Sequence, residues 1–410
     1  MIKRTITTFY LVLNLVNVHA QETIHSGQWN GRFNIGKTLP ISFEFNVKNV
    51  LKLIQIEVIN GEEKVPMQPL EMNGDTCVVK FLYFPTELRF KINSPDSITG
   101  RWVNHLKSNY SVPFTAESKQ QERSYFTDKK EAAINLTGKW NTSFYSHTED
   151  QKTPAIGVFK QKKNKITGTF LTETGDYRYL AGNVYGNKML LSAFDGSHIY
   201  QFEADYNTET KTLKGTFRSG NHFHNHFEAK LDPTVELQKA DKITFVQDSK
   251  PLEFKMVNNT KDTLIYKREK HLNKVVLIQV LGTWCSNCVD ETHFFKELQE
   301  KYGEKGLEII GVAFELGTDV EKQLEQIETY RQKFELNYPI YLGGKANKKE
   351  AAEVFNNIFN GIFSFPTAIL IDKTGNIVNI HTGFNGPGTG SYYTTYVKNT
   401  KKQIKRLLKQ

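Results

Sequence analysis

Over the first 230 residues, apolar and polar side chains alternate in short runs that are separated by turn residues. Residues 41–47, 177–182, 188–193 and 200–206 show the period of two that is typical of strands with one buried face. Breaks that contain Gly or Asn recur at intervals of roughly 8–12 residues, as meandering antiparallel sheets require. The pattern predicts an all-β region.

Three short motifs occur twice in this region, in the same order and 111 to 115 residues apart. They are Gly27-x-Trp29-Asn30 with Gly138-x-Trp140-Asn141, Ile98-x-Gly100-x-Trp102 with Leu213-x-Gly215-x-Phe217, and Phe114-x-Ala116 with Phe227-x-Ala229. A nearly constant spacing indicates a duplicated domain. We therefore expect two all-β domains, residues 21–118 and 136–232, joined by a polar linker over 119–135. Each has room for about seven or eight strands, enough for a meander barrel or a sandwich.

After Pro233 the pattern changes to strands that alternate with helices. Residues 274–281 (KVVLIQVL) are almost all apolar, as in a strand that is buried on both faces. Helical spacing follows over residues 286–302. Further strands are expected over 307–314, 338–342, 367–371 and 376–381, and further helices over 319–334, 348–359 and the C-terminal stretch. The alternation predicts an α/β domain, together with its linker, over residues 233–410.

Length and charge agree with this division. A chain of 410 residues is long for a single core. Its 24% charged and 39% hydrophobic residues are ordinary for a globular protein. The net charge of +9 is spread along the chain, apart from a basic C-terminal helix that we interpret as a solvated face. We expect neither nucleic-acid binding nor stable membrane insertion.

The first twenty residues have the pattern of an export signal. Lys3 and Arg4 precede a short apolar core over residues 9–16, and the small-residue site VHA ends at Ala20. The apolar core is too short to cross a bilayer. We expect a mature protein that starts near Gln21 and is periplasmic or secreted.

The segment GTWCSNC, residues 282–288, joins the buried strand to the following helix. Cys285 is then at the helix N-terminus, where free amide groups and the helix dipole stabilise a thiolate. Cys288 follows one turn later, within reach for a disulfide. The pattern predicts thiol–disulfide exchange, with Cys285 as the nucleophile and Cys288 as the resolving thiol.

Other interpretations of the two cysteines fit less well. A structural zinc site needs four ligands, and the sequence has no second cysteine pair or nearby histidine pair. Haem attachment needs a histidine directly after the second cysteine, where Val289 stands. The third cysteine, Cys77, lies in an apolar run, and we expect a buried, inert thiol.

A second candidate site is the sequence HFHNHF over residues 222–227. His222, His224 and His226 fall on one face of a strand, where imidazoles can bind copper or zinc. Phe223 and Phe227 would take the core face, which leaves the histidines exposed without an evident fourth ligand. We interpret them as a solvated strand face and expect no metal.

Residues 243–410 resemble the thioredoxin superfamily, and within it the TlpA/ResA-like periplasmic disulfide reductases. The resemblance rests on the WCSNC motif and on residues 364–367 (SFPT), which are similar to the family's cis-proline loop. It implies that Trp284, Phe365 and Pro366 contact the substrate. It also implies that Glu291, which many relatives carry, relays a proton to Cys288. The alternative for Glu291 is a first-turn acid that interacts with the helix dipole, as we expect for Asp290.

Several residues depart from the family pattern. Ser286 and Asn287 replace a common proline-containing pair, His293 replaces a helix-kinking proline, and Gln279 replaces a buried aspartate. These departures leave the redox potential, and hence the preferred direction, open.

The sequence therefore predicts a protein-disulfide reductase that needs no cofactor. The resemblance implies a membrane thiol-transporting reductase as electron donor and oxidised proteins, such as apocytochromes, as substrates. One alternative is a dithiol oxidase or isomerase that uses the same residues. Another is a ligand-binding protein whose β domains carry the main function.

Overall fold

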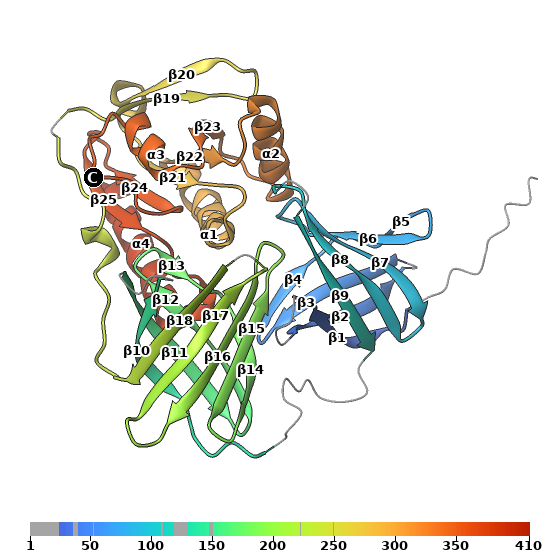
Figure 1. Ribbon diagram of the computed structural model, residues 1–410. Helices are drawn as coiled ribbons and strands as arrows, with labels where there is room; N and C mark the ends of the chain where they lie inside the picture. The colour runs from blue at the N-terminus through green and yellow to red at the C-terminus, as the bar shows by residue number, and fades with distance from the viewer. Residues whose placement is uncertain are drawn as a thin grey trace, which may run out of the picture.

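A computed structural model describes residues 24–35, 40–51, 53–107, 110–118, 130–146, 151–221, 223–248 and 250–410. The expected export signal over residues 1–20 and most of the expected linker lie outside these ranges. Two all-β domains precede an α/β domain, so the predicted fold class is confirmed (Figure 1). Within the described ranges, no helix is long and apolar enough to cross a membrane.

The first domain is a curved antiparallel sheet of nine strands whose edges are β4 and β5. Along the sheet the strands are β4 (Glu63–Pro66), β3 (Leu53–Asn60), β2 (Ile41–Val50), β1 (Gly27–Phe33), β9 (Tyr110–Ser118), β8 (Ser97–Asn104), β7 (Thr86–Ser94), β6 (Thr76–Lys80) and β5 (Glu71–Asn73). Alternate side chains of β2 are buried, because a strand points successive side chains to opposite faces. Cys77 is buried on β6, and burial raises the pKa of its thiol.

The second domain is a closed barrel. Its strands are β10 (Gly138–Tyr145), β11 (Lys152–Lys162), β12 (Lys165–Thr172), β13 (Gly175–Asp176), β14 (Leu180–Tyr185), β15 (Lys188–Phe194), β16 (Ile199–Asn207), β17 (Thr212–Ser219) and β18 (Phe223–Leu231). Pairing of β11 with β12 closes the sheet, which removes its open edges. Aromatic rings such as Phe170, Phe202 and Phe217 are packed against one another in the interior. The interior is therefore a packed core.

The two β domains place their repeated motifs at equivalent points. Trp29 on β1 and Trp140 on β10 each donate an indole N–H to a carbonyl four residues earlier, His25 and Leu136, in both cases at 2.9 Å. In each domain the first strand pairs with both the second and the last. This shared geometry is compatible with the duplication, which stays a prediction.

The third domain contains a seven-stranded mixed sheet. Its strands, in spatial order, are β20 (Thr263–Lys267), β19 (Glu253–Val257), β23 (Ile340–Lys345), β22 (Leu307–Glu315), β21 (Val275–Leu281), β24 (Thr367–Ile371) and β25 (Ile377–Thr382). Its helices are α1 (Ser286–Tyr302), α2 (Val320–Lys333), α3 (Lys348–Val354) and α4 (Ser391–Lys409), with short 3-10 turns at 240–242, 268–271, 303–305 and 387–389.

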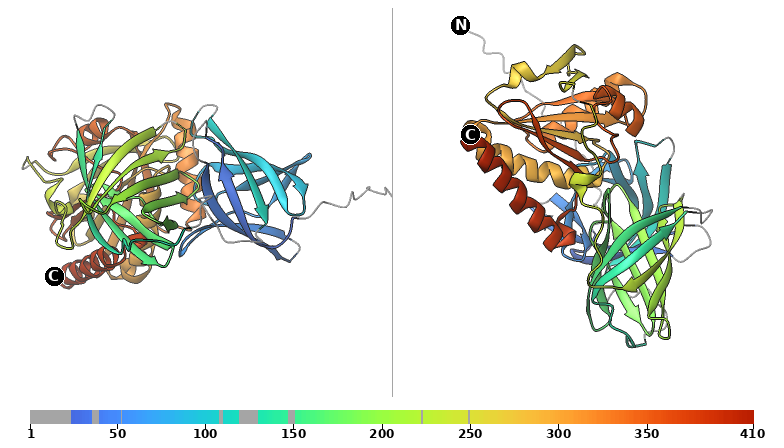
Figure 2. Two further views of the ribbon diagram at one scale, coloured as in Figure 1. Left: turned by 60° about the horizontal axis from the view of Figure 1, so that its bottom comes forward. Right: turned by 90° about the vertical axis from the view of Figure 1, so that its left-hand side faces the viewer.

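Both faces of this sheet are covered. Every residue of β21 is buried, as the continuous apolar run predicts. On one face, Leu277 shares a core with residues of α1, α2 and α4, whereas on the other, Ile278 packs with residues of α3 and of the β19–β20 hairpin. Helix α4 lies beside α1, and Phe294 contacts Tyr396 between them (Figure 2).

Local backbone geometry shortens two of the expected elements. The expected strand over residues 177–182 is wrong at its start, because Arg178 has a φ of 57° and β14 begins only at Leu180. The expected helix over 348–359 ends at Val354, since Asn356 and Asn357 adopt positive φ. The β19–β20 hairpin was not predicted.

Phe194, at the end of β15, connects the barrel to the first domain. Its ring lies edge-on to Phe33, Phe43 and Phe81 of the first domain, with centroids 4.9 to 5.2 Å apart. The amide side chain of Asn60 donates to the Phe194 carbonyl at 2.9 Å and accepts from its N–H at 3.0 Å. The open concave side of the first sheet is thereby filled by a residue of the second domain.

Arg178 joins all three domains through a buried cluster of charges. Its guanidinium donates to Asp290 of α1 at 2.8 Å and to Glu63 of β4, and its Nε lies 3.6 Å from Asp195 of the barrel. The Arg178 side chain is only 9% exposed. Burying a cation is costly unless acids compensate it, and here each domain supplies one of the acids.

We expect the substitution Arg178→Met to lower the free energy of unfolding by about 3–5 kcal/mol, because it leaves three largely buried carboxylates without their cation. Urea unfolding of the full chain at neutral pH measures this loss. Arg331→Met is the control, since it removes a half-exposed pair with Glu328 that contributes about 1 kcal/mol or less. Equal losses in the two variants would contradict the central position of Arg178.

Candidate redox site

The cysteine motif occupies the junction between β21 and α1. Cys285 is the N-cap residue of α1, with extended backbone, and its N–H donates to the Gly282 carbonyl at 3.1 Å. The backbone N–H of Cys288 donates to the Cys285 sulfur at 3.2 Å. An amide of the first helical turn thus points at the Cys285 sulfur.

The two thiols, both free in this structure, differ in environment. Cys285 is 7% exposed, whereas Cys288 is completely buried. Burial, and then the hydrogen bond and charge interaction with Cys285, raise the pKa of Cys288 well above its ordinary value. Cys285 is therefore the accessible member of the pair, and Cys288 is held protonated behind it.

The residues predicted to contact the substrate gather around Cys285. The Phe365–Pro366 bond is cis, and the Cys285 thiol donates to the Phe365 carbonyl at 3.3 Å. The indole N–H of Trp284 donates to the Phe314 carbonyl at 2.9 Å, and its ring stands edge-on to Phe365 at 5.9 Å. The structure brings Trp284, Phe365 and Pro366 together with the motif.

Glu291 lies one turn after Cys288 and is completely buried. Burial raises the pKa of its carboxyl group to about 8, although a hydrogen bond from Gln279 at 3.1 Å opposes the rise. Its other oxygen has no hydrogen-bond partner among the described residues. Gln279 replaces the buried aspartate that the family resemblance implies, so helix α1 supplies a buried carboxyl group that this strand lacks.

A second buried acid, Glu315, holds the loop before the cysteines. Its two oxygens accept from the backbone N–H and the hydroxyl of Thr283 at 2.8 and 2.7 Å. Burial raises its pKa to about 7. Sequence analysis did not select Glu315 as a site residue. Its position at the end of β22, a buried strand parallel to β21, could have indicated it.

The barrel contributes two loops to the redox site, which sequence analysis did not foresee. Ser197 donates to the Trp284 carbonyl at 3.1 Å, and Nδ1 of His198 lies 3.1 Å from the Ser286 hydroxyl. From the other loop, the Thr174 carbonyl accepts from Ser364 beside the cis-proline at 2.7 Å. Both sides of the motif are thus covered by the second β domain.

Asp290 and His293 of α1 also face the β domains. Asp290 is more than the dipole partner that was expected, because it binds Arg178, and burial raises its pKa to about 7 against the effect of that cation. His293 contacts the rings of Tyr83 and Phe334, with centroids 5.2 and 4.8 Å away. It therefore joins the first domain to α1 and α2.

Strand β18, which carries the histidines of the HFHNHF sequence, differs in part from its prediction. Phe227 is buried in the barrel as expected, but Phe223 is 45% exposed, because it lies at the end of the strand beyond the packed interior. His224 is exposed, His226 stacks on Tyr145 with centroids 5.4 Å apart, and His222 lies outside the described residues. Among the described residues, no group of three potential ligands is arranged to hold a metal.

Residues 247–397, which include both cysteines, Glu291 and the cis-proline, match the model of the Redoxin family. The C-terminal domain is thioredoxin-like. The thioredoxin-like protein YneN of Bacillus subtilis is 31% identical over 110 residues, 27% of this chain and 57% of that protein. The thiol-disulfide oxidoreductase ResA of Bacillus cereus is 29% identical over 105 residues, 26% of this chain and 53% of that protein.

The chain spans about half the length of the curated relatives that it matches. A solved structure from Bacteroides thetaiotaomicron, described as a putative protein disulfide isomerase, aligns with a TM-score of 0.31 and 19% identity. The alignment covers 42% of this chain and 96% of that one.

We expect Glu291→Gln to change the pH dependence of stability. The pKa of Glu291 is raised from an ordinary 4.5, the value in the unfolded chain, to about 8 in the folded protein. The stability that the protonated carboxyl group contributes is therefore fully present below the unfolded pKa and is lost as the pH rises through about 8. Glutamine does not ionise. The stability of the variant relative to the unsubstituted protein should therefore rise between about pH 4.5 and pH 8, by at most about 1.4 kcal/mol per pH unit, and level off at higher pH.

Urea unfolding across this pH range is the measurement, with the exposed Glu300→Gln on the same helix as control. A Glu291→Gln difference that stays constant with pH would show that this carboxyl group is not buried in its neutral form.

Proposed function

We propose that the protein is an exported thiol–disulfide oxidoreductase that reduces protein disulfides through Cys285 and Cys288. The observation that carries the proposal is the asymmetry of the pair. Cys285 caps a helix beside the cis-proline and is the accessible sulfur, whereas Cys288 is completely buried and has a carboxyl group, Glu291, one turn away.

In the reductive direction, the Cys285 thiolate attacks one sulfur of a substrate disulfide. That bond breaks, a mixed disulfide forms, and the other substrate sulfur leaves and takes up a proton. Cys288 then loses its proton and attacks the Cys285 sulfur, which releases the second substrate thiol. Two electrons pass from the protein dithiol to the substrate, and the protein is left with the Cys285–Cys288 disulfide.

Glu291 is the proton acceptor that we propose for the second step. Cys288 is buried away from water, so its proton needs an acceptor inside the protein. The pKa of an ordinary carboxyl group is too low to take a proton from a thiol efficiently, and burial raises that of Glu291 to about 8. Gln279 orients the carboxyl group through its amide.

The direction, the compartment and the partners are part of the proposal. The apparent export signal of residues 1–20 supports a periplasmic or secreted location. We propose a membrane thiol-transporting reductase as the electron donor and oxidised proteins, such as apocytochromes, as substrates. Trp284, Phe365 and Pro366 would contact the substrate chain around its disulfide.

The alternative in which the β domains carry an apolar ligand has less support. The interior of the closed barrel is filled by its own aromatic side chains. The concave side of the first domain receives Phe194 from the barrel. An oxidase that uses the same cysteines differs only in its equilibrium, and the redox potential distinguishes the two.

Cys288→Ser should trap a mixed disulfide between Cys285 and a model substrate such as insulin, since the resolving thiol is gone. Mass spectrometry after non-reducing electrophoresis detects the adduct. Cys285→Ser should yield no adduct, and Cys77→Ser should behave like the unsubstituted protein because that thiol is buried on β6 of the first domain. An adduct through Cys288 in the Cys285→Ser variant would reverse the assignment of the two thiols.

The equilibrium of the dithiol with glutathione, followed through Trp284 fluorescence, should give a potential near or below about −270 mV, as in thioredoxin. Trp284→Phe identifies the part of the signal that comes from the other tryptophans. A value near about −120 mV, as in strong dithiol oxidants, would mean that the protein works in the oxidising direction.

A further inference from the structure

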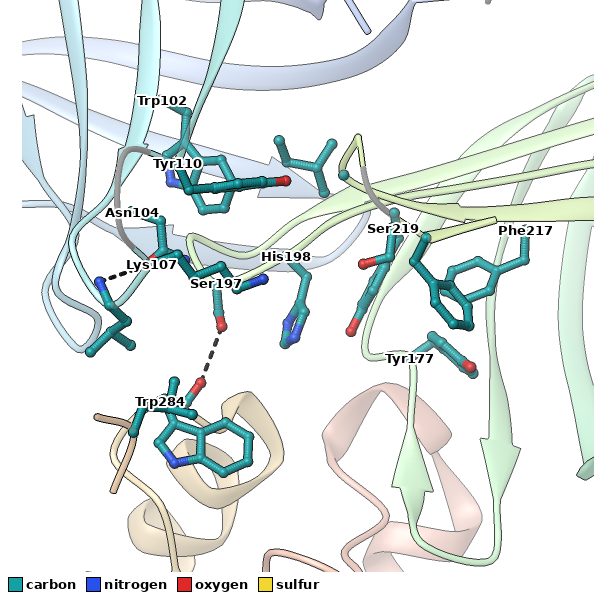
Figure 3. Close-up of a pocket in the computed structure, with 16 residues that line it drawn as sticks. Trp102, Asn104, Lys107, Tyr110, Tyr177, Ser197, His198, Phe217, Ser219 and Trp284 are labelled. Carbon is teal, nitrogen blue, oxygen red and sulfur yellow. Dashed lines mark hydrogen bonds between the residues drawn. The ribbon is translucent and has the colours of Figure 1, made fainter. Parts of the chain in front are cut away.

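A pocket of about 430 Å³ lies where the three domains meet, beside the cysteine motif (Figure 3). Its wall combines Trp102 and Tyr110 of the first domain, Tyr177, Tyr200 and Phe223 of the barrel, and Trp284 of the redox domain. The pocket does not exist in any one domain by itself. Its size falls within the range of pockets that bind small ligands or a few side chains.

Seven of the sixteen residues that line this pocket are Trp, Tyr or Phe, and they come from all three domains. Tyr200 stacks on His198 with centroids 4.8 Å apart. None of the lining residues is acidic, and the basic ones are Lys107 and His198. Such a wall favours apolar and aromatic groups over a ligand that carries several charges.

The pocket adjoins the redox motif at Trp284, which forms part of its wall. Ser197, in its wall, donates to the Trp284 carbonyl at 3.1 Å, and His198 lies 3.1 Å from the Ser286 hydroxyl. Trp284 and Ser286 are the two neighbours of Cys285 in the chain. The pocket thus borders the chain on one side of Cys285 through Trp284, and His198 of its wall reaches the residue on the other side.

We propose that this pocket binds an apolar or aromatic side chain next to the disulfide of an extended polypeptide substrate. The inference rests on the proposed function and adds a substrate class to it. Cys285 is only 7% exposed and is flanked by barrel loops, so an extended segment can reach it more readily than the surface of a folded domain. The β domains thus select the substrate for the redox domain.

The test compares two short peptides that differ only next to their cysteine, which is followed by Phe in one and by Ser in the other. In both, the cysteine is joined by a disulfide to the chromophore thionitrobenzoate. The pre-reduced full chain is mixed with each peptide, and chromophore release gives the second-order rate constant. We expect the Phe peptide to react about tenfold faster, the scale of discrimination that an apolar pocket provides.

Two substitutions should abolish this preference. Phe223→Ser removes an exposed part of the wall, and Ser219→Phe fills the pocket from the neighbouring strand. Leu231→Ser is the matched control, because Leu231 lies at the other end of β18, is similarly exposed, at 51% against 45%, and should leave the preference unchanged.

Rates measured with the Ser peptide and with glutathione disulfide distinguish a failure of the pocket assignment from a failure of the proposed function. Equal rates for both peptides, with the dithiol still reactive, would overturn the pocket assignment and leave the proposed function intact. Faster reduction of glutathione disulfide than of either peptide, lost in Ser219→Phe, would assign the pocket to a small charged disulfide and overturn this proposal. No reaction with any disulfide would refute the proposed function itself.

Discussion

The arrangement of the three domains depends on the burial of one cation, Arg178. An arginine withdrawn from water needs acids close to it, and Glu63, Asp195 and Asp290 come from the first, second and third domains. The buried charge of Arg178 has all three of its acidic partners only when the three domains are assembled. Arg178 also donates to the Ser286 carbonyl at 2.9 Å, so the same residue that assembles the domains holds the cysteine motif against the barrel.

One short segment of the barrel then connects the domain interface to the chemistry. Phe194 fills the first domain, Asp195 faces Arg178, and Ser197 and His198 bind the residues on either side of Cys285. Because these residues are consecutive or nearly so, docking of the β domains and shaping of the redox site are one structural event. This accounts for a reactive thiol that is less exposed than its position at a helix N-terminus would suggest.

Around the cysteines, burial decides which groups hold protons. Glu291 and Glu315 are both withdrawn from water, and their pKa values of about 8 and 7 keep much of each carboxyl population neutral near neutral pH. A neutral carboxyl group can be kept next to a buried thiol at much lower cost than a charged one. The ionised fraction of Glu291 is the proton acceptor that we propose for Cys288, and burial brings its pKa closer to that of a thiol than the pKa of an exposed glutamate.

The sequence by itself determined the features that depend on neighbouring residues. The apolar run of β21, the helical spacing of α1 and the two cysteines between them indicated the redox motif, and period-two alternation indicated the β domains. Only the tertiary structure decided the charge cluster of Arg178, the contacts of Ser197 and His198, and the aromatic pocket. The interdomain hydrogen bonds of Arg178, Ser197 and His198 join residues that are 87 to 115 positions apart along the chain, and a charge or a ring carries no local signal of a partner that distant. Their pairing follows from how the three domains pack, and periodicity in one strand or helix does not contain that information.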